Sequence, residues 1–226
     1  MLARLRSRSR SGEDRGTTLV EVIVASTIGA LALAATYTVF WGFTDDVAVA
    51  TDLASAQRET RPVISAMVIE LRQATPPNAA AGGNPVVALS TTSASFVTDR
   101  WDATGPELVT YQLESCSAGL CDLRQTVIAA DTTAVEPEWT HDDATLVLDR
   151  IVARDVVDPA SSGDALFAGV NYVAGAAVET ASCDVSTGTA CDFALVAVDL
   201  KIDPNGLRDN PRVYEVYEEV RMRNAQ

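Results

Sequence analysis

The chain has 226 residues and a formal net charge of −14. This acidity argues against nucleic-acid binding, which depends on Lys and Arg side chains that meet phosphates, and it suits solubility in an aqueous compartment. The length is sufficient for a long helix followed by one further domain of about 150 residues.

The N-terminal segment combines a basic leader with a long apolar run. Residues 1–15 carry five Arg and two acidic residues, so the chain after Arg15 has a formal charge of −17. From Thr17 to Phe43 the chain is mainly apolar, lacks Pro and has one charged residue, Glu21. A helix of this length would extend roughly 40 Å, which is enough to cross a bilayer. The Arg-rich flank predicts a cytoplasmic N-terminus, with the rest of the chain extracytoplasmic.

Glu21 is the most informative residue of the apolar run. A carboxylate within a membrane-spanning helix is costly and indicates a functional role. Two other interpretations of the run compete with that role. A cleaved secretory signal would have a shorter apolar region and a small-residue cleavage site. An uncleaved signal anchor explains the run but gives no reason for a carboxylate in the first turns of the helix.

The sequence Gly16-Thr-Thr-Leu-Val-Glu21 resembles the prepilin signature of type IV pilins and type II secretion pseudopilins. The resemblance implies that a prepilin peptidase cleaves after Gly16 and that Thr17 becomes a methylated N-terminus. The first mature residue of the family is usually Phe, and Thr17 departs from that pattern. In a fibre, Glu21 would pair with the Thr17 amine of a neighbouring subunit. That pair would set the axial register, because a mispaired subunit would leave a buried charge uncompensated.

Helical periodicity continues beyond the membrane segment. An apolar stripe follows Pro62, which is expected to kink the helix or to separate two segments, and Glu70 is predicted to lie off this stripe. The stripe consists of Val63, Ile64, Met67, Val68 and Leu71. Pro76-Pro77 then ends the helix. The predicted organisation is a leader at 1–16, a transmembrane and assembly helix at 17–43, its amphipathic continuation at 44–75 and an extracytoplasmic β-rich domain at 76–226.

The remainder of the chain predicts an antiparallel sheet. Strands are expected at 94–98, 107–114, 123–128, 167–173, 194–202 and 213–222, whereas 146–157 is ambiguous between strand and helix. The segments 107–114 and 123–128 flank a short Cys loop and are expected to form a hairpin. The predicted fold class is therefore α+β, with the long hydrophobic N-terminal helix packed on an antiparallel sheet.

The four cysteines occur as two local pairs, Cys116 with Cys121 and Cys183 with Cys191. Three pairings are possible. The local pairing is favoured because each pair can close a small loop next to strand ends, and disulfides fit an oxidising extracytoplasmic compartment. A zinc site is the alternative, but neither a C-x₂-C spacing nor an accompanying His supports it.

Other candidate sites are weak, and no catalytic residue, cofactor or metal is predicted. His141, the only His, adjoins Asp142 and Asp143 and is interpreted as a surface residue rather than part of a catalytic triad. Two carboxylates beside Trp139, Glu136 and Glu138, lack the pattern of a glycosidase. A loop with three possible calcium ligands, namely Asp203, Asn205 and Asp209, lacks the distal Glu of a calcium loop.

Four segments in order are similar to minor pilins and to J-type minor pseudopilins. They are Leu-Arg-Gln-Ala at the end of the helix, Ser-Phe-Val-Thr-Asp, Pro-Glu-Leu-Val-Thr-Tyr-Gln-Leu, and a terminal Arg-Met-Arg-Asn. This similarity implies a non-enzymatic subunit that is a substrate of prepilin peptidase and resides in the inner membrane before assembly. It would then pack its N-terminal helix against other pilin or pseudopilin subunits, at the tip of a fibre at the cell surface or in the periplasm.

Two other classes of function compete with this one. A membrane-anchored cell-surface binding protein or adhesin would need no Glu21, and residues 75–226 alone would bind its ligand. An anchored hydrolase would need a convergent acid–base pair, and the sequence offers none.

Overall fold

The computed structural model describes residues 18–76, 84–100, 105–131, 140–180, 182–204 and 213–222, with the backbone alone at 142–144. The chain divides into two compact units, Met1–Ala48 and Val49–Gln226. The predicted leader, with Gly16 and Thr17, lies outside the described residues.

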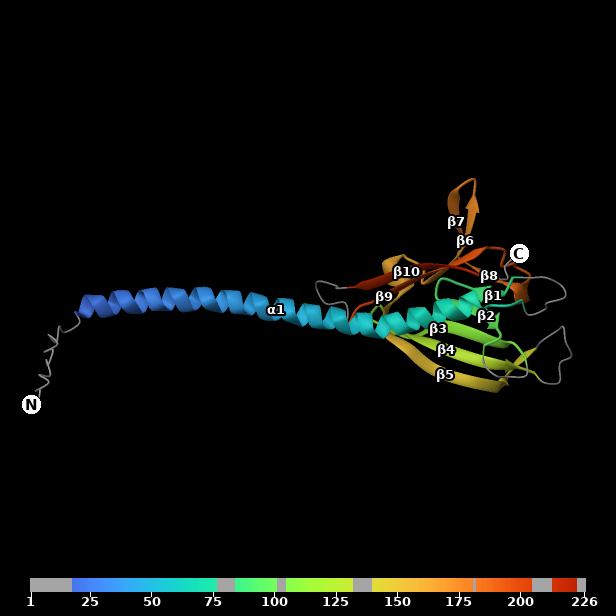
Figure 1. Ribbon diagram of the computed structural model, residues 1–226, viewed down its shortest axis with the longest axis horizontal. Helices are drawn as coiled ribbons and strands as arrows, with labels where there is room; N and C mark the ends of the chain where they lie inside the picture. The colour runs from blue at the N-terminus through green and yellow to red at the C-terminus, as the bar shows by residue number, and fades with distance from the viewer. Residues whose placement is uncertain are drawn as a thin grey trace, which may run out of the picture. The chain divides into compact units, whose positions relative to one another are not determined.

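One helix, α1 (Leu19–Arg72), accounts for 54 residues (Figure 1). It passes through Pro62 as a single element, so of the two effects expected of Pro62, a kink or a break, the break does not occur. Proline removes the N–H that would bond to the carbonyl of Arg58 four residues earlier. Pro62 and Arg58 are both exposed residues of the helix.

The second unit contains a ten-stranded antiparallel sheet. Along the main path the strand order is β7-β6-β9-β5-β4-β3-β2-β1-β8, and β10 pairs with β9. The strands are β1 (Val86–Leu89), β2 (Ser93–Thr98), β3 (Glu107–Ser117), β4 (Leu120–Ala130), β5 (His141–Val157), β6 (Phe167–Val173), β7 (Ala176–Thr180), β8 (Cys183–Asp184), β9 (Leu195–Ile202) and β10 (Tyr214–Arg221). Two short helices, α2 (Pro159–Ser162) and η1 (Val185–Thr187), complete the described elements.

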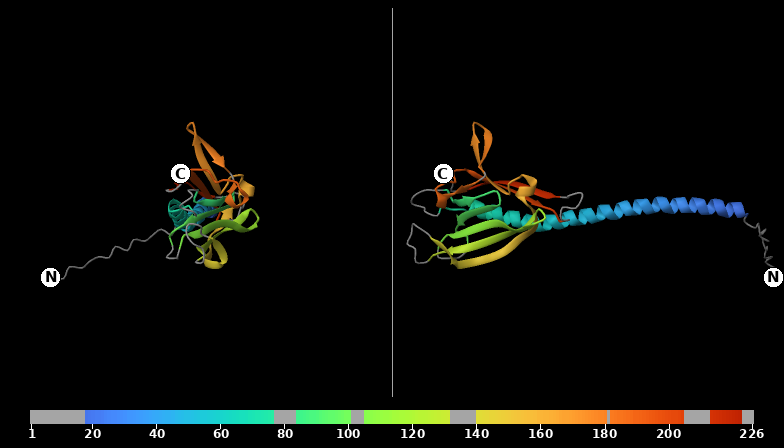
Figure 2. Two further views of the ribbon diagram at one scale, coloured as in Figure 1. Left: turned by 90° about the vertical axis from the view of Figure 1, so that its right-hand side faces the viewer. Right: turned by 180° about the vertical axis from the view of Figure 1, so that it is seen from behind.

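The sheet has two parts, and the ladder between them consists of one residue pair. In the ladder, β5 pairs with β9 only at Val156 and Ile202. On one side of this junction β5 continues through β4, β3 and β2 to β1 and β8, and on the other side β9 lies with β6, β7 and β10. The two groups diverge in Figure 2, and the β6–β7 hairpin stands away from the rest of the unit.

The core lies between the last turns of α1 and both parts of the sheet. Met67 and Leu71 of α1 are fully buried, in one cluster with Phe96 of β2, Tyr111 of β3 and Val198 of β9. Alternation explains the strands: in β3, Val109, Tyr111 and Leu113 are buried while the residues between them are more exposed. The predicted α+β fold, with a long apolar N-terminal helix packed on an antiparallel sheet, is confirmed.

One residue in the amphipathic part of α1 differs from the prediction. Glu70 is 1% exposed, although it was expected to lie off the buried face. Its position explains the burial, because Met67, Glu70, Leu71 and Ala74 follow the spacing of one helix face. A buried carboxylate requires partners, and the sheet supplies them, as described below.

Candidate functional site

The N-terminus of α1 holds the residue that the sequence singles out. Glu21 lies in the first turn, and its Oε2 accepts a hydrogen bond of 3.4 Å from the Thr18 N–H. The Glu21 N–H in turn donates to Thr18 Oγ1 at 3.3 Å. This reciprocal pair is a capping box, which satisfies two N–H groups that the start of a helix leaves unpaired. The pattern Thr-x-x-Glu was present in the sequence, and it would have predicted this local role.

The apolar part of α1 is exposed along its whole length. Its large apolar side chains are exposed, among them Leu19, Ile28, Leu33, Val39 and Phe43. α1 is the one helix in the described part of the chain that is long and apolar enough to span a membrane. A signal sequence near an N-terminus meets the same criterion.

The hydroxyl groups in this apolar part bond back to the helix. Thr27 Oγ1 donates to the Val24 carbonyl oxygen at 2.8 Å, and Thr36 Oγ1 donates to that of Ala32 at 2.8 Å. In lipid every polar group must find a partner within the protein. These internal bonds allow Ser and Thr in the segment without an unpaired donor.

Comparison with known proteins identifies no relative. No family model, no curated protein and no solved structure matches the chain. Arguments about function therefore depend on the residues and on their geometry.

Two disulfides stabilise the second unit, with the local pairing expected from the sequence. Cys116 and Cys121 join β3 to β4 across the turn at Ala118 and Gly119, and both turn residues have positive φ angles. The same pair lies near Asp158, and together they form the one group of three possible metal ligands among the described residues. Because both sulfur atoms are bonded to each other, they cannot ligate zinc as thiolates.

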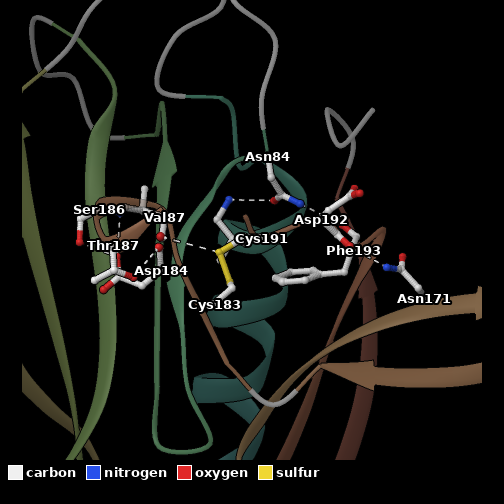
Figure 3. Close-up of a disulfide and its surroundings, with 11 residues drawn as sticks. Asn84, Val87, Asn171, Cys183, Asp184, Ser186, Thr187, Cys191, Asp192 and Phe193 are labelled. Atoms are coloured by element: carbon white, nitrogen blue, oxygen red, sulfur yellow. Dashed lines mark hydrogen bonds between the residues drawn. A yellow bond between two sulfur atoms is a disulfide. The ribbon is translucent and has the colours of Figure 1, made fainter. Parts of the chain in front are cut away.

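The second disulfide, Cys183–Cys191, closes a loop that contains η1 (Figure 3). Residues after the loop are fixed by two Asn side chains. Asn84 Nδ2 donates to the Phe193 carbonyl oxygen at 3.0 Å, and Asn171 Nδ2 donates to that of Asp192 at 2.6 Å. The loop is therefore attached to β6 and to the start of β1 as well as by its own disulfide.

Of the remaining candidate residues, the structure describes His141 and Asp203. His141 Nε2 donates to the Pro106 carbonyl oxygen at 2.8 Å, which joins the start of β5 to the chain before β3. Asp203 is buried. The other candidates lie outside the described residues, namely Glu136, Glu138, Trp139, Asn205 and Asp209.

A buried polar network beside α1 was missed by the sequence interpretation. Glu70 Oε1 accepts from Arg100 at 2.7 Å, while its Oε2 accepts from the Tyr111 hydroxyl at 2.7 Å and from Gln125 Nε2 at 2.9 Å. Arg150 donates to Gln125 Oε1 at 2.9 and 3.0 Å. Burial, followed by the Glu70 charge, raises the pKa of Tyr111 well above its ordinary value, so the hydroxyl remains a donor. The network fixes α1 to β3, β4 and β5.

Proposed function

We propose that the chain is a minor pilin or pseudopilin subunit, processed by prepilin peptidase after Gly16 and assembled through its N-terminal helix. The observation that carries this proposal is the change of surface along α1. Its side chains from Leu19 to Phe43 are exposed and mainly apolar, whereas those from Ala56 to Leu71 contribute to the core of a β-rich unit. One helix therefore offers an assembly surface at its start and an anchor for a folded domain at its end.

The fibre supplies a partner for the Glu21 carboxylate. Within the described residues, Thr18 alone bonds to this group, and the contact is long. The Thr17 amine of a neighbouring processed subunit would compensate the charge in the apolar interior of a fibre. The two disulfides support an oxidising, extracytoplasmic location for the second unit, with the N-terminus cytoplasmic before assembly.

The capping box favours a second candidate, a membrane-anchored surface binding protein. It explains Glu21 by a role within its own helix. The Glu21 carboxylate accepts from the Thr18 N–H, and the Thr18 hydroxyl accepts from the Glu21 N–H. In that case the residue would stabilise an anchor helix and would need no neighbouring subunit.

Substitutions at positions 18 and 21 separate the two candidates. Glu21→Gln removes the charge but retains a side chain that serves in a capping box. Thr18→Ala keeps the charge and removes the cap, at about 1 kcal/mol of helix stability. For a pilin, Glu21→Gln should prevent incorporation into fibres, since an uncompensated buried charge costs about 3–5 kcal/mol. Thr18→Ala should incorporate nearly normally.

The measurement is the amount of each variant in sheared or purified fibres relative to the amount in membranes, in the native host. Glu59→Gln provides a control, because Glu59 is exposed on the same helix. The intact mass of the wild-type protein should correspond to a chain that starts at Thr17. An intact leader in a host with active prepilin peptidase, or equal incorporation of Glu21→Gln and wild type, would exclude the pilin proposal and favour the anchored binding protein.

A further inference from the structure

The β6–β7 hairpin extends beyond the other strands of the sheet (Figure 1). β6 pairs with β9 only from Phe167 to Val170, whereas its pairing with β7 continues to Val173 and Ala176. Among the described strands, none other pairs with this end of the hairpin, which is therefore a two-stranded ribbon. Two strands alone are at best marginally stable in water, and a third strand with an apolar face stabilises them.

The outer edge of β7 ends the path of the sheet, and none of the described strands pairs with it. The two residues between Val173 and Ala176 both have positive φ, which is the geometry of a type I′ turn. Backbone bonds between Val173 and Ala176 close such a turn, and the bonds between β6 and β7 then recur at every second residue. The N–H and C=O groups of Ala177 and Glu179 therefore point to the outer edge.

β7 lacks the features that protect an edge strand from another chain, namely several charges, Pro or bulges. β7 contains one charged residue, Glu179, and no Pro, and its ladder with β6 is regular over five residue pairs. Two other edges of the sheet are protected. β10 has four charged residues among eight, and the ladder between β5 and β4 has four register shifts. Of these three edges, that of β7 is open to a further strand.

The end of the hairpin is apolar on both faces. Tyr172, Val173 and Val178 are 55%, 62% and 48% exposed, and consecutive strand residues such as Tyr172 and Val173 lie on opposite faces. The Tyr172 hydroxyl donates to Glu219 Oε2 of β10 at 3.0 Å, which ties the hairpin to the rest of the sheet. A strand beside β7 would place its own side chains next to those of β7 on both faces and would remove apolar surface from water.

We propose that the outer edge of β7 binds an extended, basic and apolar segment of another protein, which joins the sheet as an additional strand. The backbone of that segment would bond to the N–H and C=O groups of Ala177 and Glu179. A basic segment is favoured because Glu179 is the one charge of β7 and the chain has a formal net charge of −14. A second copy would bring the same negative charge and would be repelled. The proposal does not depend on the assembly function of α1.

The probe is the peptide N-acetyl-Lys-Val-Thr-Val-Thr-Val-Lys-amide in two N-methyl isomers, each titrated into the full chain in non-ionic detergent micelles. N-methyl groups on the third and fifth residues block one edge of the peptide and leave the other edge free. N-methyl groups on the fourth and fifth residues remove a donor from each edge. The isomers have the same charge and composition, so attraction to micelles or to acidic surface should be equal for both.

Calorimetry measures the affinity of each isomer, and amide hydrogen exchange measured by NMR identifies the site. The isomer with one free edge should bind at least about fivefold more tightly, the equivalent of one backbone hydrogen bond. It should also slow exchange of the Ala177 and Glu179 N–H groups. Equal affinities, no binding, or slowed exchange only at other residues would overturn the proposal. Concentration-dependent protection of these two amides in the protein alone would identify a second copy as the occupant and would also overturn it.

Two substitutions at position 179 separate backbone pairing from charge. Glu179→Gln removes the charge and keeps the N–H, and it should weaken binding about twofold, as for an exposed ion pair. Glu179→Pro removes both, and Pro is tolerated in an edge strand where the N–H faces solvent. It should weaken binding about tenfold, because the loss of a backbone bond adds to the loss of the charge. Equal effects of the two substitutions would indicate attraction by charge alone and would overturn strand pairing.

Discussion

At the scale of single residues, the most consequential group in the second unit is the carboxylate of Glu70. It is fully buried and has three partners from three segments of the sheet region, Arg100, Tyr111 and Gln125. Such a network stabilises the fold only while every polar group in it has a partner. Removal of one member leaves its hydrogen-bond partners unpaired. Glu70 therefore orients the end of α1 on the sheet more specifically than apolar packing would.

Glu70→Ala should destabilise the protein by at least about 1–3 kcal/mol, the typical cost of a buried donor left without its acceptor, because the Tyr111 hydroxyl and Gln125 Nε2 both donate to Glu70. Urea unfolding followed by circular dichroism in detergent would measure the change. Glu59→Ala, an exposed carboxylate of the same helix, should change the free energy of unfolding by less than about 0.5 kcal/mol. Equal effects of the two substitutions would show that the network contributes nothing beyond the helix itself.

At the scale of elements, the chain between β8 and β9 is ordered with little secondary structure. The Cys183–Cys191 disulfide, two Asn side chains and the Phe193 ring hold it. Phe193 lies directly on Gly169 of β6, where an added Cβ would be only 2.4 Å from the ring. A glycine at this position is explained by the close approach of the ring.

Gly169→Ala should cost about 1–3 kcal/mol, because the ring must move away from a well-packed position. In a Phe193→Ala background the same substitution should cost much less, since the clashing atoms are gone. A double-mutant cycle of unfolding free energies measures this coupling. Additive effects would mean that the ring relaxes freely and that the contact does not restrict position 169.

Periodicity predicted those elements whose burial alternates along the chain. β9 has core residues at Val196, Val198, Leu200 and Ile202, and its predicted limits differ from the observed ones by one residue. β7 was not predicted because its residues are mostly exposed, so its two faces do not differ in burial and give no alternating pattern. β1 and β8 are too short for a pattern. At the candidate site the sequence identified Glu21, and its Thr-x-x-Glu pattern is that of the observed capping box. The burial of Glu70 could be found only from the geometry, because a charged residue in a helix is ordinarily expected on its exposed face.

At the scale of the whole molecule, the core belongs to one unit that includes the last part of α1. All residues of the main core cluster lie between Ala56 and Met222, within the unit Val49–Gln226. The predicted domain of residues 76–226 omits five residues of this cluster, namely Ala56, Ile64, Met67 and Leu71 of α1 and Ala74 just after it. The helix end is therefore a structural component of the β-rich unit as well as a connection to the apolar segment.

A fragment of residues 49–226 should fold without detergent, form both disulfides and unfold cooperatively, because it keeps the whole core cluster. A fragment of residues 75–226 should not fold. It lacks three large core side chains, Ile64, Met67 and Leu71, each worth about 2–5 kcal/mol. Their sum reaches the total stability of a typical domain, about 5–15 kcal/mol. The loss of Glu70 would add to this deficit.

Thermal unfolding monitored by near-ultraviolet circular dichroism compares the two fragments. Cooperative unfolding of the shorter fragment would mean that the sheet is stable without its helix, and ligand binding could then be studied on residues 75–226 alone.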